Sequence, residues 1–254
     1  MAPGFDEALL ARIEDAGINA SAPPEQRWID GWLVRFSPGK AKRARCIQAV
    51  APGRLSVAGK LARCLPVYAV VGLRPYVRIT PFSQPGELDD ELARLGWERI
   101  DDTRVMVAPS LSALSPLPDG FRLEPADPGA FTHWIAAARG STSAEQAAHA
   151  RRVAASPVPY EALLVRDEHG GAVAGGQLAV EGDVVGLYDV FSHEAHRGLG
   201  LAQALCSAML QRAREAGASV GYLQVDASNE VARRLYRRLG FADAYAYHYR
   251  TPRI

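Results

Sequence analysis

The feature that most constrains this chain is a strand, a glycine-bearing turn and a helix that follow one another over residues 184–210. Residues 184–191 form a compact run of β-branched and aromatic side chains, which predicts a buried strand. After a polar turn, Gly198 and Gly200 precede an amphipathic helix that begins near Leu201. The first amides of a helix have no partner within it and lie at the positive end of its dipole, so this turn is suited to hold a phosphate. The glycines let the backbone approach the anion closely.

The turn does not match two common phosphate-binding motifs. The dinucleotide fingerprint requires Gly or Ala at the third position after Gly200, where this chain has Gln203, and the P-loop requires Gly-Lys-Ser/Thr. The chain instead has Arg-x-x-Gly-x-Ala, at Arg197, Gly200 and Ala202. This pattern resembles the acyl-CoA pyrophosphate loop of the GNAT superfamily of N-acyltransferases, which is Gln/Arg-x-x-Gly-x-Gly/Ala.

A second motif follows the strand expected at residues 219–225. It contains Asn229, Ala232 and Leu235-Tyr236, followed by Gly240-Phe241. The GNAT core ends with a similar pattern, Asn-x-x-Ala-x-x-Leu-Tyr and then Gly-Phe, and every position matches. Two motifs in this order, joined by one helix and one strand, identify the C-terminal half by resemblance as a GNAT acyl-CoA N-acyltransferase.

The resemblance implies an α+β fold, the GNAT fold with its mixed, mostly antiparallel sheet. A Pro, Ser and Gly-rich segment at 110–119 predicts a linker between a domain of residues 1–112 and a catalytic domain of residues 119–254. The helix ending at Leu95-Gly96-Trp97 is similar to the one ending at Leu239-Gly240-Phe241, and both precede an expected strand. We therefore expect two tandem copies, the first degenerate because it lacks an Arg-x-x-Gly-x-Ala loop. Alternatively, Leu-Gly-aromatic is a common helix ending.

Other local patterns predict individual elements. In the N-terminal half they favour one strand over 27–36, a second over 43–50, a helix over 55–65 and a further strand over 67–73. In the C-terminal half, Ser143 with Gln146 is expected to form a capping box at the start of a helix.

Composition narrows the class of protein. The chain has 254 residues and a formal net charge of +1, which argues against binding to nucleic acid or to a membrane surface. Its three cysteines are widely spaced and lack a CxxC, so we expect neither a disulfide framework nor a metal site. No signal peptide or membrane-spanning stretch is visible, which favours the cytoplasm. The sequence does not predict an oligomeric state.

Basic residues dominate one part of the N-terminal half. Between residues 27 and 78, Asp30 is the only acidic residue among many Arg and Lys. Either these side chains form a solvated strand face, or they bind an anionic partner such as nucleic acid or a cofactor phosphate.

The resemblance implies where acetyl-CoA binds. The end of the strand at 190–192 would pair with the pantetheine arm, and the amides of residues 197–202 would cradle the pyrophosphate. Asn229 would either hydrogen-bond the cofactor arm or cap its own helix. The residues expected to bind acetyl-CoA are Val190, Phe191, Ser192, Arg197, Gly198, Leu199, Gly200, Leu201, Ala202 and Asn229.

The resemblance also implies direct attack of an amine on the thioester, without a covalent enzyme intermediate. Tyr236 would be the general acid, since a phenol with a pKa near ~10 is matched to a leaving thiolate with a pKa near ~8.5. Asp189 lies on the strand beside the reaction centre and is the best candidate for the proton acceptor. Alternatively, Asp189 is a strand-end carboxylate paired with an arginine.

These expectations combine into one function. We expect an N-acetyltransferase that moves an acetyl group from acetyl-CoA to a primary amine of a small molecule or protein, in a ternary complex and without a metal. The alternative is a non-catalytic acyl-CoA sensor that keeps the fold without turnover. Thiol release in the presence of amines separates the two.

Overall fold

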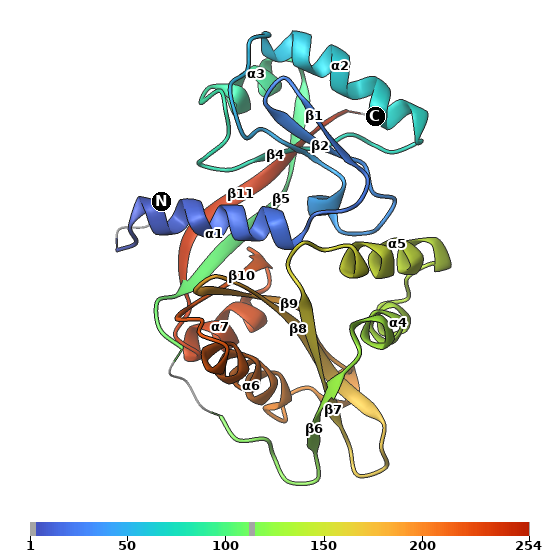
Figure 1. Ribbon diagram of the computed structural model, residues 1–254, viewed down its shortest axis with the longest axis vertical. Helices are drawn as coiled ribbons and strands as arrows, with labels where there is room; N and C mark the ends of the chain where they lie inside the picture. The colour runs from blue at the N-terminus through green and yellow to red at the C-terminus, as the bar shows by residue number, and fades with distance from the viewer. Residues whose placement is uncertain (1–3, 112–114, 254) are drawn as a thin grey trace.

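Within the part of the chain described by the computed structural model, residues 4–111 and 115–253, eleven strands form one mixed sheet (Figure 1). The N-terminal half contributes α1 (Glu7–Ala20), β1 (Gln26–Ile29), β2 (Trp32–Arg35), a 3₁₀ turn (Lys42–Ala44), β3 (Ile47–Gln48), α2 (Val57–Val70), β4 (Val77–Ile79), α3 (Leu88–Arg94) and β5 (Trp97–Ala108). The C-terminal half contributes β6 (Arg122–Ala126), α4 (Pro128–Ala138), α5 (Ser143–Ala154), β7 (Tyr160–Arg166), β8 (Ala172–Glu181), β9 (Val184–Ser192), a 3₁₀ turn (Glu194–His196), α6 (Leu201–Glu215), β10 (Val220–Asp226), α7 (Glu230–Arg238) and β11 (Ala242–Pro252).

Both halves repeat the same order of connections. In each half a helix joins two parallel neighbouring strands: α2 joins β3 to β4, and α6 joins β9 to β10. In each half a second helix then leads into a long strand, α3 into β5 and α7 into β11. This α+β architecture is the GNAT arrangement, and the repetition agrees with the expected duplication. The boundary at 112–119 stays a prediction, and residues 112–114 lie outside the described part.

The last strand of each half pairs with the other half. The strand order across the sheet is β1-β2-β3-β4-β11-β5-β10-β9-β8-β7-β6. Thus β5 is antiparallel to β10, with Ala108 opposite Gly221, and β11 is antiparallel to β4, with His248 opposite Ile79. At the centre β5 and β11 pair with each other. The halves are therefore joined by backbone hydrogen bonds across one sheet.

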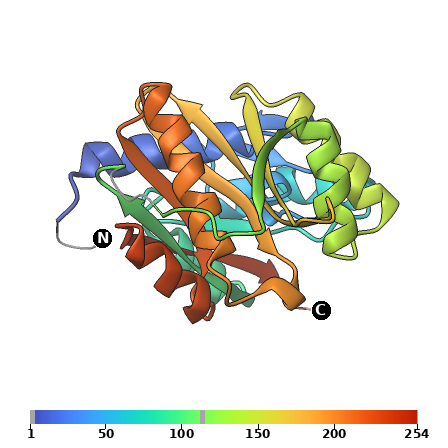
Figure 2. The same cartoon turned by 90° about the horizontal axis from the view of Figure 1, so that it is seen from below.

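Helices cover the sheet and close three main cores. Figure 2 shows α6 crossing the strands of the C-terminal half, where Leu205 and Met209 are fully buried. Helix α1 lies between the two halves in Figure 1, and Leu10 and Ile13 pack into a core shared with β5, β10 and β11. A third core lies beneath α2 and α3, around Trp32.

A buried ion pair anchors α1 to the sheet. Arg78 of β4 is 2% exposed and donates Nη2 to Oε2 of Glu14 at 3.1 Å. Its guanidinium lies 3.9 Å from the ring centroid of Tyr247, and the hydroxyl of Tyr245 donates to Glu14 at 2.7 Å. Burial alone would lower the pKa of Arg78, but the negative charge of Glu14 outweighs it and holds this pKa above its usual range.

The expected strand over 27–36 is wrong, because the chain reverses in its middle. Asp30 and Gly31 both have positive φ, 45° and 83°, and form the two-residue turn of a β1–β2 hairpin. Asp-Gly is a strong hairpin signal, since both central residues of the favoured turn need positive φ. The expected second strand over 43–50 is present only as β3.

The expected strand over 67–73 is also wrong, because α2 continues through Pro66 to Val70. The β-branched run suggested a strand, but Val67 and Tyr68 are buried with Leu61 and Cys64 at helical spacing. Burial of Val67 and Tyr68 in the tertiary structure therefore outweighs the local preference of this run for a β-strand.

Two further expectations need correction. The capping box of α5 is formed by Thr142 and Glu145, one residue before the expected pair. The basic residues of the N-terminal half do not all lie on a solvated face, since Arg35 and Arg78 are buried. Arg35 instead donates to the carbonyl of Ile18 at 2.9 Å, which ties β2 to α1.

The Glu14–Arg78 pair yields a stability prediction. Replacing Glu14 with Gln leaves a buried guanidinium without its countercharge, so we expect the free energy of unfolding to fall by about 3 kcal/mol. Urea denaturation measures this change. Glu7→Gln, at an exposed position of the same helix, is the matched control and should change stability by less than about 0.5 kcal/mol. Equal effects of the two variants would contradict the anchoring role.

Candidate functional site

The candidate site lies where β9 and β10 separate. Their parallel pairing runs from Val184 opposite Val220 to Leu187 opposite Leu223. Beyond that point β9 continues to Ser192 on β8, while β10 continues to Asp226 on β5. The edge of β9 that faces β10 therefore has no strand partner beyond Leu187, and a cleft can open there.

A β-bulge lies in the separated part of β9. Tyr188 is opposite Gln177 and Phe191 is opposite Gly175, so Asp189 and Val190 together face the single residue between them on β8. Asp189 has a φ of 51°, which a non-glycine residue rarely adopts. Bulges redirect side chains, and here two consecutive residues line two different cavities.

The first cavity is a groove of about 750 Å³ between β9, the turn before α6, and α7. Of the residues expected to bind acetyl-CoA, only Leu199 is not part of its wall, and this side chain is 48% exposed. The groove is lined by Val190, Phe191, Ser192, His196, Arg197, Gly198, Gly200, Leu201, Ala202, Gln203, Asn229, Val231, Ala232, Arg234, Leu235, Tyr236 and Arg238.

The groove is suited to an anion. Its wall contains Arg197, Arg234 and Arg238 and no Asp or Glu. Gly198 and Gly200 have φ of 81° and 80°, and no hydrogen bond among the described residues uses the amides of residues 198–202. Free amides at the start of α6 and three guanidinium groups together favour a polyphosphate ligand.

Tyr236 and Asn229 reach the groove from α7 and the turn before it. Tyr236 is 9% exposed, and burial raises the pKa of its phenol, so the hydroxyl stays protonated at neutral pH. Asn229 accepts a hydrogen bond from the amide of Ala232 at 3.1 Å through Oδ1 and so caps α7. Since Asn229 also lines the groove, capping does not remove its proposed contact with the cofactor.

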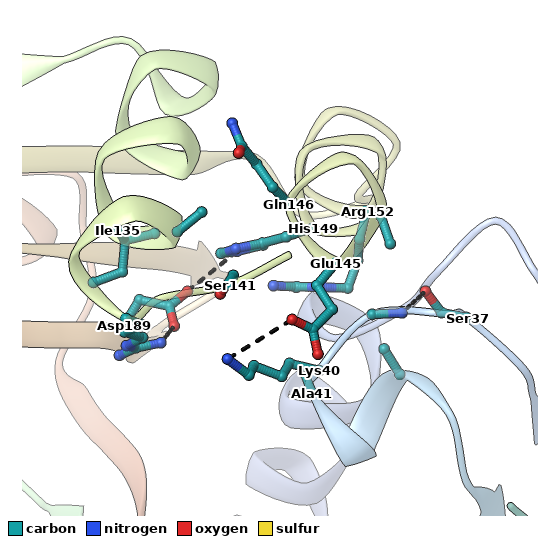
Figure 3. Close-up of a pocket in the computed structure, with 15 residues that line it drawn as sticks. Ser37, Lys40, Ala41, Ile135, Ser141, Glu145, Gln146, His149, Arg152 and Asp189 are labelled. Atoms are coloured by element: carbon teal, nitrogen blue, oxygen red, sulfur yellow. Dashed lines mark hydrogen bonds and ion pairs between the residues drawn. The ribbon is translucent and has the colours of Figure 1, made fainter. Parts of the chain in front are cut away.

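The second cavity, of about 310 Å³, lies between the two halves of the chain (Figure 3). The loop after β2 forms one wall, and α4 and α5 form the other. Asp189 lines this cavity while its neighbour Val190 lines the groove, so the two cavities flank the bulge of β9. The cavity is lined by Ser37, Gly39, Lys40, Ala41, Ala44, Ile135, Ala136, Arg139, Ser141, Glu145, Gln146, Ala148, His149, Arg152 and Asp189.

Asp189 is ion-paired. Its carboxylate accepts from Nη1 of Arg139 at 2.6 Å and lies 3.3 Å from Nε2 of His149 (Figure 3). Burial alone would raise the pKa of Asp189, but the contact with His149 and the charge of Arg139 outweigh it and hold this pKa well below its usual range. Asp189 is thus paired with an arginine, as the alternative expectation had it, and its role as proton acceptor stays a prediction.

Sequence patterns did not single out Arg139, His149 or Arg152. Arg139 lies immediately after α4, and His149 and Arg152 lie on α5. None of them belongs to a motif, and they come close to Asp189 only through the tertiary packing of these helices. Lys40 comes from the other half of the chain. No local signal could have assembled this set.

The turn before α2 is the N-terminal counterpart of the turn before α6, and its amides are already occupied. The Asp30 carboxylate accepts from the amide of Arg54 at 3.0 Å and of Leu55 at 2.8 Å, and it lies 3.3 Å from Nζ of buried Lys60. These backbone hydrogen bonds, from Leu55 and then Arg54, lower the pKa of Asp30. An internal carboxylate thus takes the place that a phosphate would occupy.

Residues 4–111 and 115–253 contain no candidate metal site and no candidate membrane span. In this part of the chain, no group of three or more His, Cys, Asp or Glu side chains could hold a metal ion. No helix in it has the length and apolar character needed to cross a membrane.

Comparisons with known proteins agree with this geometry. A family model described as "Probable histone acetyltransferase Rv0428c C-terminal" matches residues 8–250. The Bacillus subtilis (strain 168) protein "Uncharacterized N-acetyltransferase YobR" is 26% identical over 235 residues, which is 90% of this chain and 92% of that protein.

Solved structures share the fold. A GCN5-related N-acetyltransferase from Kribbella flavida aligns with a TM-score of 0.67 and 19% identity, over 100% of this chain and 98% of that one. A tandem GNAT protein from the clavulanic acid biosynthesis pathway aligns with a TM-score of 0.64 and 13% identity, over 81% and 74% of the two chains. Because the family model spans almost the whole chain, this protein belongs to the Rv0428c C-terminal acetyltransferase family and is a GNAT acyltransferase.

Proposed function

We propose that this acyltransferase moves an acetyl group from acetyl-CoA to a primary amine. The observation that carries the proposal is the groove, in which free amides at the start of α6 and three arginines face a space without any carboxylate. A nucleotide carrier with a pyrophosphate fits this charge pattern. Calorimetric titration with acetyl-CoA tests donor binding, and thiol release with amines tests transfer, which a non-catalytic sensor would lack.

The reaction needs one bond formed and one broken. The amine nitrogen attacks the thioester carbonyl, the carbon–sulfur bond breaks, and the CoA thiolate takes up a proton while the amine loses one. Tyr236 lines the groove and carries a protonated phenol, which supports its role as the donor of the proton to the thiolate. The amide of Val190, on the separated part of β9, is the proposed donor to the oxyanion.

We assign the role of proton acceptor to His149, with Asp189 as its partner. A carboxylate whose pKa is held low is a weak base, so Asp189 alone is poorly suited to accept the amine proton. Imidazole is the side chain most often used for proton transfer near neutral pH, and a neighbouring carboxylate orients it and stabilises its charged form. His149 lines the second cavity and lies 3.3 Å from Asp189.

Gly200→Ala tests donor binding. A Cβ at this position would stand where the phosphate approaches the amides, so we expect the Kd for acetyl-CoA to rise about tenfold or more. Gly72→Ala is the control, because Gly72 also has positive φ, 65°, with free space around it, but lies outside the groove. Both variants should lose about 1–2 kcal/mol of stability. Equal acetyl-CoA affinity in the two variants would count against the loop.

Tyr236→Phe tests the proton donor. We expect kcat to fall about 10²-fold with little change in acetyl-CoA affinity, because only the hydroxyl is removed. Since burial raises the pKa of Tyr236, its deprotonation should not limit the wild-type rate up to about pH 10. Steady-state thiol release measures both. Tyr76→Phe, at a buried tyrosine outside both cavities, should keep full activity. An unchanged kcat in Tyr236→Phe would remove this residue as the acid.

His149→Gln tests the proton acceptor. Gln keeps a polar side chain but cannot take up the amine proton, so kcat should fall about 10²-fold with little change in the Kd for acetyl-CoA. Steady-state thiol release measures kcat, and calorimetric titration measures the Kd. His169→Gln, at a side chain that is 83% exposed, should leave kcat unchanged. An unchanged kcat in His149→Gln would exclude His149.

A further inference from the structure

We propose that the amine acceptor is an aminocarboxylate, a small molecule that carries a carboxylate beside its primary amine, and that Arg152 binds this carboxylate in the cavity between the two halves. This inference rests on the proposed acyl transfer and assigns the chemical class of its acceptor. It depends on the lack of an acidic partner for Arg152 among the described residues, and on the charges, the position and the volume of the cavity.

Arg152 is a buried cation without an acidic partner. It is 8% exposed and lines the cavity from α5. It donates from Nη1 to the hydroxyl of Tyr160 at 3.3 Å and to the carbonyl of Ala20 at 3.4 Å. Both acceptors are neutral and both bonds are long. A buried guanidinium is stabilised far better by a carboxylate, and no described residue supplies one within ion-pair distance.

The other charges of the cavity are already matched. Arg139 pairs with Asp189 at 2.6 Å, and Lys40 lies 3.8 Å from Glu145. Glu145 also accepts from the amide of Thr142 at 2.9 Å as part of the α5 capping box. His149 lies against Asp189. The wall of the cavity therefore has one unmatched positive charge, which belongs to Arg152 (Figure 3).

The cavity and the groove lie on either side of the β9 bulge. Asp189 lines the cavity together with His149 and Arg152, and its neighbour Val190 lines the groove. Arg152 is near enough that its charge contributes to the low pKa of Asp189. A compact molecule that places its carboxylate at Arg152 can therefore place its amine beside His149 and Asp189, the residue before Val190 at the proposed reaction centre.

The volume of the cavity supports a small acceptor. About 310 Å³ is at the lower end of the range for sites that bind small molecules. The loop that contains Lys40 and helix α5 close it from opposite sides. A peptide-borne lysine has no carboxylate near its ε-amine, so it would leave Arg152 unpaired. Lysine peptides, the acceptors suggested by the family's description, therefore serve as a competing arm of the test.

The experiment compares amines that differ only in the carboxylate. Thiol release from acetyl-CoA is measured with glycine, β-alanine and 4-aminobutyrate, with their carboxamides, and with a lysine-containing peptide. We expect kcat/KM to be at least about tenfold higher for one of the acids than for its amide. Arg152→Gln should bring that ratio close to one by raising KM for the acid. Arg152→Lys, which keeps the charge, should retain part of the preference.

Arg151→Gln is the matched control, since Arg151 is adjacent on α5 but points outward to Glu25. Calorimetric titration of the preferred acid, with and without CoA, measures binding independently of transfer. Saturable binding that is lost in Arg152→Gln would support the inference even if acetyl transfer were absent, which separates it from the proposed function. Equal kcat/KM for acids and amides, preference for the lysine peptide, or the same ratio in Arg152→Gln would each overturn it.

Discussion

The pairing of β10 with β5 is the interaction on which the candidate site depends. A strand that leaves its neighbour in a sheet exposes backbone groups that must find other partners. Strand β10 can separate from β9 after Leu223 because its opposite edge stays paired with β5 as far as Asp226. Strand β9 stays paired with β8 over the same stretch. Strands β5 and β11 each pair with a strand of the other half. The last strand of the N-terminal half therefore holds β10 in place beside the groove of the C-terminal half.

The two halves show how one architecture can bind an external anion or an internal one. Each has a parallel strand pair with a crossover helix, and a turn with exposed backbone amides precedes each crossover helix. At α6 these amides face an open groove rich in arginine. At α2 the Asp30 carboxylate fills the equivalent position, and a Cβ on Gly53 would meet Asp30 itself. Because a carboxylate within the chain is always present, the second arrangement leaves no place for a phosphate. This offers a physical account of why a duplicated half would lack a cofactor site.

Local chemistry explains how far the sequence could predict this protein. The strand, glycine turn and helix around Gly200, and the α7 motif with Tyr236, were predictable because each function depends on neighbours in the chain. The Asp30-Gly31 hairpin also has a local signal, because Asp-Gly favours the positive φ values of a two-residue turn. The helical course of Val67 was not predictable, since burial overrode its β preference. The second cavity was equally out of reach, because Lys40, Arg152 and Asp189 meet only through tertiary packing.

The charges of that cavity act on both groups of the proposed acceptor. An amine must be neutral to attack a thioester, and surrounding positive charge lowers the pKa of an amine. The same positive charge binds a carboxylate, most strongly where a buried guanidinium is unpaired. Asp189 would favour the charged ammonium, but its pairing with Arg139 and His149 reduces that influence. An aminocarboxylate would thus be held by one end and kept nucleophilic at the other. A lysine peptide would meet the same positive charge without an ion pair to Arg152, so the proposed wall would both select the acceptor and keep its amine neutral.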